Sequence, residues 1–244
     1  MLKIINLNIN VEKKNILKSI DLQFHRWKNY CILGQNGSGK SSLALTIMWH
    51  PKYLIENGKL IINNWKELIE LNNLSPDKRA KLWIFLAFQN IPEIQGIKLF
   101  EFLRNIYNTN TWEKLTFLKF KDLIIPIVEE VWLHKDFLRR DLNVWFSGWE
   151  RRKVEILQIK LLKPKYIFLD EIDSGLDIDA FKSIAKMIEE LNNKDNCFIF
   201  ITHHFEILQN IDIDEVIILK NGEIKQKWDK KLVEKIKKEG FKDL

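Results

Sequence analysis

Glycine is scarce in this sequence. The chain has 9 glycines in 244 residues, or about 4%, where about 7% is usual in proteins. Tryptophan is abundant by comparison, also with 9 residues. Together the two types make up 18 of 244 residues, about 7%, which is the usual share of glycine alone. The total number of tryptophans therefore nearly matches the number of glycines that the chain lacks.

Cysteine and long apolar runs are also lacking. The two cysteines, Cys31 and Cys197, lie in separate apolar runs, so we expect buried side chains rather than a disulfide or a zinc site, which needs more ligands. No run reaches the roughly 18 apolar residues of a membrane-spanning helix. The N-terminus has neither the basic start nor the apolar centre of a signal peptide. We expect a cytoplasmic protein without direct membrane insertion.

The charge of the chain excludes another class of partner. The formal net charge is +6 and the isoelectric point is near 9.1, but the lysines are scattered and no basic run alternates with aromatic residues. Binding of nucleic acid is therefore not expected. Hydrophobic residues make up 46% and charged residues 30%, a globular balance. The length suits one sizeable core, or a core with an inserted lid.

A glycine-rich segment at residues 34–41 matches the phosphate-binding pattern G-x-x-x-x-G-K-S. The apolar run 30–33 predicts a short buried strand before it, and 42–48 predicts a buried helix after it. In that setting backbone N–H groups turn toward phosphate oxygens, Lys40 reaches the terminal phosphates, and the Ser41 hydroxyl can bind Mg²⁺. We predict a nucleotide-phosphate site formed by Gly34, Gln35, Asn36, Gly37, Ser38, Gly39, Lys40, Ser41 and Ser42.

Phosphate chemistry also needs a buried strand that ends in acids. Residues 166–169 are apolar and lead directly to Asp170 and Glu171. The first carboxylate would hold Mg²⁺ through water, and the second would polarise an attacking water molecule. The strand predicted at 84–89 ends in Gln89, and His203 follows a strand predicted at 197–202. We interpret these two residues as candidate sensors of the metal, the water and the γ-phosphate.

The order of the predicted elements indicates an α/β fold with a mixed sheet. Residues 1–26 predict antiparallel strands, whereas the later strands alternate with helices. Residues 99–142 have a helical pattern, which we interpret as an inserted helical subdomain. Smaller predicted features are a turn and strand at 56–64, a helix opened by Ser75-Pro76, a helix from Glu150 to Leu162, and a hairpin at 215–224 with an Asn-Gly turn.

These motifs occur in the order found in ABC-type ATPases, a family that the chain resembles over nearly its whole length. Ser147-Gly148 before Glu150 resembles the signature segment of that family, and the run 174–177 follows the two acids. Three longer runs resemble the SufC family in particular, the ATPases of the SUF machinery for iron–sulfur cluster assembly. They are residues 88–94, 146–158 and 169–180.

The resemblance implies a P-loop NTPase of the ABC ATPase type, with 1–244 as a single domain. Residues 1–94 and 155–244 would form the nucleotide-binding core, with a mixed sheet and an N-terminal antiparallel part. Residues 95–154 would form the inserted helical subdomain that carries the signature.

The resemblance also implies an Mg²⁺-dependent ATPase. Two copies would form a nucleotide-dependent homodimer, closed head to tail around two ATP molecules, and closure would act on scaffold proteins of the SufB/SufD type. The implied catalytic residues are Glu171, His203 and Gln89, and the implied metal ligands are Ser41, Gln89 and Asp170. Besides the phosphate loop, the implied ATP contacts are Ser147, Gly148, Trp149 and Asp177.

Two features depart from the family pattern. Trp149 occupies the second glycine position of the Ser-Gly-Gly signature, where an indole would obstruct the γ-phosphate of the partner's ATP. The segment from Val11 to Leu17 offers no aromatic residue on which adenine could stack, so the adenine contacts stay open.

The other tryptophans also occupy positions that favour glycine. Trp49 follows the phosphate-loop helix at a C-cap position, and Trp27, Trp65 and Trp228 are expected in turns. We interpret the whole pattern as UGA codons that the source organism reads as glycine and that were translated as tryptophan. The alternative is a genuinely tryptophan-rich ATPase that has lost closure. The remaining members of the set are Trp83, Trp132 and Trp145, where the family has glycine, and Trp112, which follows a polar loop.

Three functions are therefore open. The first is a SufC-like ATPase that drives conformational change in a scaffold, and the second is the ATPase subunit of an ABC transporter, docked on a membrane permease. The third, a non-hydrolysing nucleotide-binding module, requires Trp149 to be genuine. Co-purifying partners separate the first two, and ATP turnover tests the third.

Overall fold

The chain divides into two compact units in the computed structural model. The structure describes residues 1–239 except 13, 65, 66, 112, 205–207, 209 and 210. The first unit comprises Met1–Leu86, Lys165–Ile172 and Asn192–Leu244, and the second comprises Ala87–Pro164 and Asp173–Leu191. The predicted helical subdomain, 95–154, lies wholly within the second unit. Each unit is described by itself.

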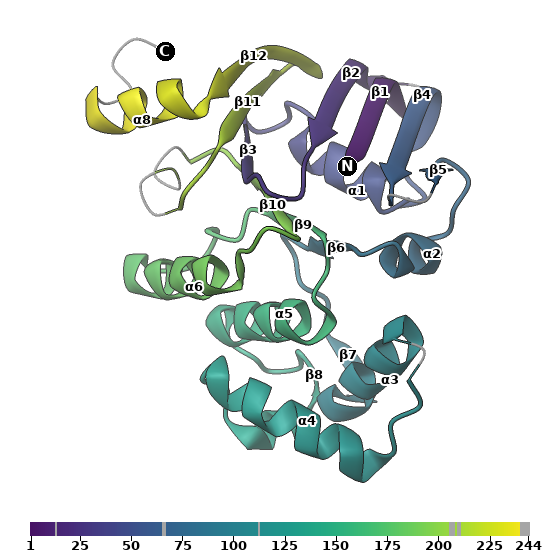
Figure 1. Ribbon diagram of the computed structural model, residues 1–244, viewed down its shortest axis with the longest axis vertical. Coiled ribbons are helices and arrows are strands. Elements are labelled where there is room, and N and C mark those ends of the chain that lie inside the picture. Colours follow the sequence, from purple (N-terminus) through teal and green to yellow (C-terminus); the bar gives the residue numbers. More distant parts are fainter. Residues whose placement is uncertain (13, 65–66, 112, 205–207, 209–210, 240–244) are drawn as a thin grey trace. The chain divides into compact units, whose positions relative to one another are not determined.

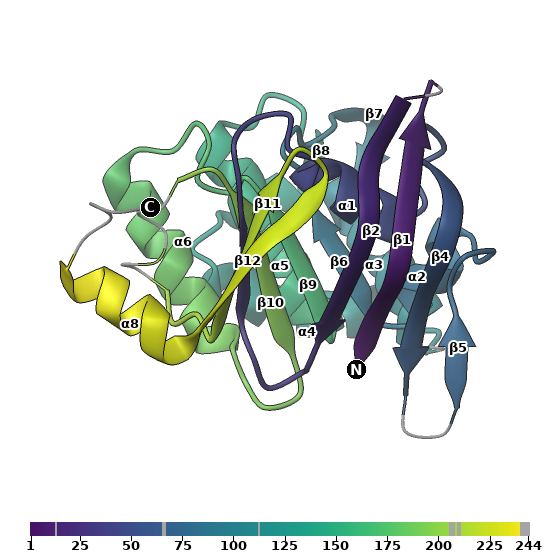
Figure 2. The same cartoon turned by 90° about the horizontal axis from the view of Figure 1, so that it is seen from above.

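A four-stranded antiparallel sheet opens the first unit (Figure 2), and it contains the antiparallel strands predicted for residues 1–26. The strands β1 and β4 pair in the middle, but the predicted turn at residues 56–58 is wrong. These residues lie within β4, where its register with β1 shifts. Gly58 has φ 95°, and a Cβ there would lie 2.4 Å from the Asn6 carbonyl oxygen, so glycine marks a bulge. In spatial order the strands are β2 (Lys14–Phe24), β1 (Leu2–Val11), β4 (Leu54–Asn63) and β5 (Leu68–Glu70).

A six-stranded mixed sheet forms the other layer of this unit (Figure 1). The strands β3, β9 and β10 are parallel and entirely buried, which explains their continuous apolar sequences. Cys31 in β3 and Cys197 in β10 are fully buried there. In spatial order the strands are β12 (Glu223–Asp229), β11 (Glu215–Lys220), β3 (Tyr30–Leu33), β10 (Cys197–Thr202), β9 (Tyr166–Asp170) and β6 (Ile84–Ala87).

Helix α1 (Lys40–Ile47) contacts strands of both sheets of the first unit, and α2 (Pro76–Lys81) begins at the predicted proline. Helix α8 (Lys230–Glu239) follows β12. Arg79 of α2 is fully buried and donates five hydrogen bonds, which fix the end of α1 to the segment before α2. The acceptors are the carbonyl oxygens of Thr46, Ile47, Leu71, Asn72 and Leu74, at 2.7–3.1 Å.

The second unit is mainly helical, as the pattern between Leu99 and Leu142 predicts. Helix α5 packs against α3, α4 and α6, and its buried face includes Val154 and Leu157. It begins at Gly148, two residues before the predicted Glu150. The elements are β7 (Ile94–Lys98), α3 (Leu99–Thr111), α4 (Phe117–Glu130), η1 (Lys135–Arg139), β8 (Asp141–Leu142), α5 (Gly148–Leu162) and α6 (Ile178–Leu191).

Four tryptophans have a left-handed backbone. Trp49, Trp83 and Trp132 come two residues after α1, α2 and α4, with φ of 57°, 66° and 51°, and Trp145 has φ 60°. The first three occupy the position at which helices most often end in glycine. Eleven described residues other than glycine have positive φ, and these four are among them. Because few non-glycine residues adopt this conformation, such a share for one residue type is not expected by chance.

The other tryptophans do not share this backbone. Trp27 lies in a turn but without positive φ, and Trp149 is helical within α5. The expected turn at Trp228 is wrong: this residue lies in β12 opposite Val216 and is only 4% exposed. Trp65 and Trp112 lie outside the described residues.

Candidate active site

The phosphate loop joins β3 to α1 in the first unit. The Lys40 ammonium donates to the carbonyl oxygens of Gly34 and Gln35, at 2.7 and 3.1 Å. The Ser38 hydroxyl is buried, and no hydrogen-bond partner for it is found among the described residues. A Cβ on Gly34 would lie 2.7 Å from that hydroxyl. The loop therefore holds a cation and an unsatisfied donor at positions that suit phosphate oxygens.

A pair of oxygen donors lies beside this loop. The Ser41 hydroxyl at the start of α1 donates to Oδ1 of Asp170 at 2.9 Å, and Asp170 is the last residue of β9. A hydroxyl and a carboxylate are the hard oxygen ligands that Mg²⁺ prefers. These residues therefore fit the implied metal ion.

Glu171 and His203 form a second pair in the same unit. Oε1 of Glu171 lies 3.1 Å from Nδ1 of His203, and the glutamate side chain is buried while the histidine is partly exposed. The backbone of Glu171 has φ 48°, and its N–H donates to Ile201 of β10 at 2.8 Å. A left-handed glutamate is a strained conformation of the kind that collects at functional sites. The hydrogen bond to Ile201 therefore holds the backbone from which this carboxylate projects.

Burial lowers the pKa of Lys40, and the carboxylates of Glu171 and Asp170 act in the opposite direction. The two acids thus offset part of the effect of burial on the ammonium. One cation and two carboxylates therefore lie close enough to interact where β3 and β9 end.

The signature-like segment starts α5 in the second unit. The Ser147 hydroxyl accepts from the Glu150 N–H at 3.2 Å, and the Glu150 carboxylate accepts from the Ser147 N–H at 2.7 Å, which makes a capping box. Lys153 lies over the Trp149 ring, 4.8 Å from its centroid. A cavity of about 350 Å³ is lined by Gln89, Asn90, Ile91, Phe146, Gly148, Arg151, Arg152, Ser174 and Gly175.

Replacing Ser147 with alanine is expected to lower the free energy of unfolding by about 1 kcal/mol, because the helix loses its side-chain cap. Urea denaturation followed by circular dichroism measures it. Ser75→Ala is the matched control, since Ser75 directly precedes α2 and its hydroxyl binds the Asp77 side chain rather than a backbone N–H of the helix. Equal losses in the two variants would contradict the capping role.

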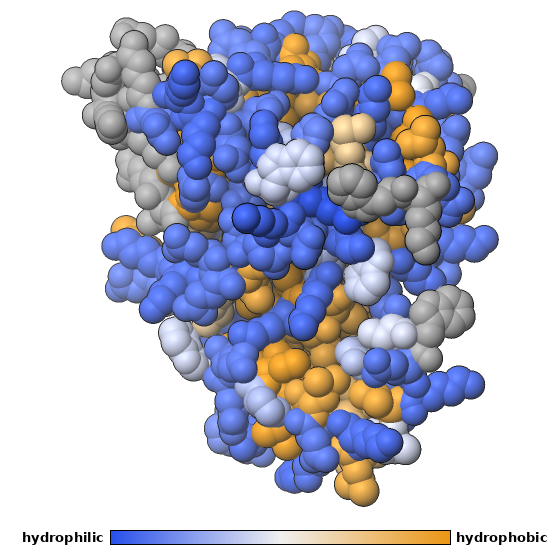
Figure 3. Space-filling view, viewed as in Figure 1, coloured by the Kyte–Doolittle hydropathy of each residue, from blue (hydrophilic) through white to orange (hydrophobic). Residues whose placement is uncertain are grey.

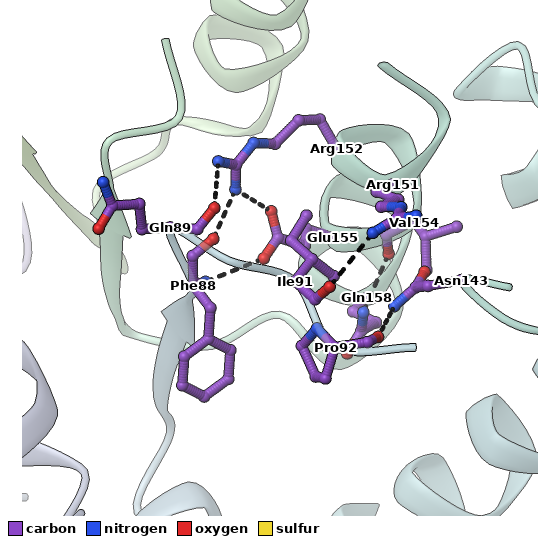
Figure 4. Close-up of polar contacts among 10 residues, drawn as sticks. All are labelled: Phe88, Gln89, Ile91, Pro92, Asn143, Arg151, Arg152, Val154, Glu155 and Gln158. Carbon is purple, nitrogen blue, oxygen red and sulfur yellow. Dashed lines mark hydrogen bonds and ion pairs between the residues drawn. The ribbon is translucent and has the colours of Figure 1, made fainter. Parts of the chain in front are cut away.

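Gln89 lies two residues beyond β6, in a segment held by α5 (Figure 4). The contacts come from Arg152 and Glu155, which the sequence interpretation missed. Arg152 donates to the carbonyl oxygens of Phe88 and Gln89, and Glu155 accepts from the Phe88 N–H. The available signal was two opposite charges three residues apart on the predicted helix.

The structure brings the predicted residues together in two sets. Asp177 belongs to the second set, where its carboxylate accepts from the Ala180 N–H at the start of α6 at 2.8 Å. The first unit contains the phosphate loop from Gly34 to Ser42, Asp170, Glu171 and His203, and the second contains Gln89, Ser147, Gly148, Trp149 and Asp177. Their functional roles remain predictions.

The chain was compared with known proteins. Residues 17–174 match the family model described as ABC transporter. The probable ATP-dependent transporter ycf16 of Cyanidium caldarium is 39% identical over 246 residues, covering 99% of this chain and 95% of that protein. The probable ATP-dependent transporter slr0075 of Synechocystis sp. is 38% identical over 245 residues, covering 99% and 94%. The family model covers the phosphate loop, Asp170 and Glu171, and it ends before His203.

Solved structures show the same fold. The ATP-binding cassette MJ0796, in a dimeric post-hydrolysis state bound to ADP and Pi, has a TM-score of 0.79 at 20% identity, over 94% of this chain and 98% of that chain. The predicted α/β fold with a mixed sheet is confirmed. No helix within the described residues is long and apolar enough to span a membrane.

Proposed function

The chain belongs to the ABC ATPase family, and from that premise we propose that it hydrolyses Mg²⁺·ATP to drive conformational change in an iron–sulfur cluster assembly scaffold, as SufC-type ATPases do. The observation that carries the hydrolytic part is the 2.9 Å hydrogen bond from Ser41 to Asp170. It joins the phosphate loop to the acidic end of β9. The scaffold part rests on the resemblance of residues 88–94, 146–158 and 169–180 to the SufC family.

The residues of the first unit would have separate roles in binding and hydrolysing ATP. The Lys40 ammonium exchanges its two loop carbonyls for phosphate oxygens, and the Ser38 hydroxyl donates to another. Ser41 and Asp170 hold Mg²⁺, which when bound offsets phosphate charge. The Glu171 carboxylate accepts a proton from the attacking water, while His203 orients that carboxylate from 3.1 Å.

The residues of the second unit would act on a second copy of the chain. In a nucleotide-dependent homodimer, Ser147 and Gly148 at the start of α5 would meet the γ-phosphate of the partner's ATP, because helix N-termini favour anions. The dimeric MJ0796 cassette supports this arrangement by analogy of fold. Gln89 would then report metal and water occupancy to the segment that contains it.

The second unit also offers a surface for the scaffold. Phe117 and Leu118 of α4 are 50% and 69% exposed, and apolar side chains are visible over this unit in Figure 3. A cavity of about 590 Å³ is lined by residues of α3, α4 and η1. Exposed apolar surface of this kind is typical of docking sites.

Affinity purification of the tagged chain from its native cells tests the partner. We expect co-purification of SufB/SufD-like proteins from the cytoplasm, and loss of those partners on Leu118→Glu. Leu68→Glu is the matched control, because Leu68 is equally apolar and exposed but lies in the first unit. A membrane permease in place of the scaffold would support the transporter function, which the names of the two relatives favour.

We also propose that the native chain carries glycine at its tryptophan positions, because its organism reads UGA as glycine. Support comes from the number of tryptophans, which nearly matches the glycine shortage, and from the four left-handed tryptophans. For Trp149 the support is the signature that glycine would complete. Trp228, buried in β12, is the member that backbone geometry supports least. A genuine Trp149 would instead favour a non-hydrolysing nucleotide-binding module.

A further inference from the structure

We propose that Arg152 and Glu155 of α5 are positioning residues that lock the Gln89 segment to the signature segment, so that the two shift together on nucleotide binding. The consequence for turnover rests on the proposed ATPase function. The lock itself does not, because it is a set of contacts within the second unit.

Four contacts form the lock (Figure 4). Oε1 of Glu155 accepts the Phe88 N–H at 3.0 Å, and Oε2 accepts from Nη1 of Arg152 at 2.7 Å. The same Nη1 donates to the Phe88 carbonyl oxygen at 2.8 Å, and Nη2 donates to the Gln89 carbonyl oxygen at 3.4 Å. The pair thus binds three backbone groups, which are the Phe88 N–H and the carbonyl oxygens of Phe88 and Gln89.

The same helix carries the signature. Ser147 caps α5, and the lock lies only one to two turns further along. Arg151 adds a link between the two segments, because it donates to the Phe146 carbonyl oxygen at 3.0 Å and pairs with Glu93. A displacement of the first turns of α5 is therefore transmitted to the backbone around Gln89 through hydrogen bonds rather than through loose side-chain contact.

Stability alone does not explain this pair. The Arg152 and Glu155 side chains are 6% and 7% exposed, and a buried ion pair can often be replaced by apolar residues without loss of stability. Apolar side chains, however, could not bind the backbone groups of Phe88 and Gln89. A double replacement by methionine therefore separates packing from positioning.

The pair is also sensitive to pH near neutrality. Burial raises the pKa of Glu155 to about 7, against the opposing effects of Arg152 and the Phe88 N–H. Helices α3, α4 and α6 also pack against α5, but among the described charged groups Arg152 is the one that contributes to this shift. Below this pKa the carboxyl group carries a proton and binds Arg152 and Phe88 less well, so the lock loosens as the pH falls.

Arg152→Met/Glu155→Met is the test variant. Lys160→Met is the matched control, because Lys160 lies on the same helix, α5, and makes a surface ion pair with Glu130 of α4. We expect the double variant to keep the denaturant midpoint of the parent. Hydrogen exchange at the Phe88 amide should rise about tenfold, the equivalent of one lost hydrogen bond. We expect kcat for ATP to fall about tenfold with KM within twofold.

Each outcome decides a separate statement. Unchanged exchange at Phe88 in the double variant would overturn the lock. Faster exchange with an unchanged kcat would overturn its role in positioning. A parent chain without turnover would contradict the proposed ATPase function, while exchange would still test the lock. In an active parent, kcat should fall as the pH drops through about 7, and Glu155→Gln should remove that step.

Discussion

Replacing Glu171 with glutamine is expected to reduce the rate of ATP hydrolysis on the order of 10²–10⁴-fold, the range for loss of a general base. The amide keeps the size of the side chain and can still contact His203, 3.1 Å away in the parent, but it cannot accept the water proton. ATP binding should persist, because Lys40 and Ser38 are unchanged. Phosphate release in single-turnover conditions measures the effect.

A variant of the phosphate loop is the counterpart. Lys40→Ala removes the ammonium that holds Gly34 and Gln35, so it should weaken nucleotide binding as well as turnover. Binding of a fluorescent ATP analogue distinguishes the two variants. If Glu171→Gln and Lys40→Ala lost nucleotide binding equally, Glu171 would be a residue that binds ATP and not the general base. Turnover by Glu171→Gln at the parental rate would remove it from the mechanism altogether.

Glycine is the expected residue at positions 145 and 149 in protein isolated from its native cells. Mass spectrometry of the peptide that spans residues 141–151 reads both positions at once. Glycine at both would complete the signature and leave the start of α5 open to the partner's γ-phosphate. Tryptophan at both would contradict the recoding and favour a nucleotide-binding module without hydrolysis.

The four left-handed positions give a stability test of the same proposal. A left-handed backbone costs an L-residue about 1–2 kcal/mol, whereas glycine there costs about 0.5–1 kcal/mol through its unfolded state. Changing Trp49, Trp83, Trp132 and Trp145 to glycine should therefore stabilise the chain by on the order of 2 kcal/mol in total.

Trp27→Gly is the matched control for those four changes. Trp27 lies in a turn and is exposed, but it has no positive φ, so its replacement should destabilise slightly. Chemical denaturation of both variants gives the comparison. The same sign of change in both would break the link between these tryptophans and backbone strain.

Local sequence was sufficient to predict the elements whose function or geometry depends on adjacent residues. The phosphate loop, the acidic end of β9 and the Asn-Gly hairpin each depend on a few neighbours along the chain. Gly58 was different, because the bulge exists only through the Asn6 carbonyl of another strand. Trp228 was misplaced since the register of β11 and β12, and not the residue itself, puts it opposite Val216.

The candidate site shows the same limit. Asp170, Glu171 and His203 were found because each follows an apolar run that predicts a buried strand. Arg152 and Glu155 were missed because nothing local says that their partners are the backbone groups of Phe88 and Gln89, more than 60 residues earlier. Their role depends on how α5 packs within its unit, which composition and periodicity do not reveal.

The two cysteines have a bearing on chemistry outside the chain. Both thiols are sealed within the central parallel strands, and burial raises the pKa of Cys197 well above its usual value. Since the thiolate is the form that attacks electrophiles and binds metals, neither buried thiol is available to a persulfide or an iron ion. In the scaffold function proposed above, the cluster would therefore be built on thiols of the partner proteins and not on those of this chain.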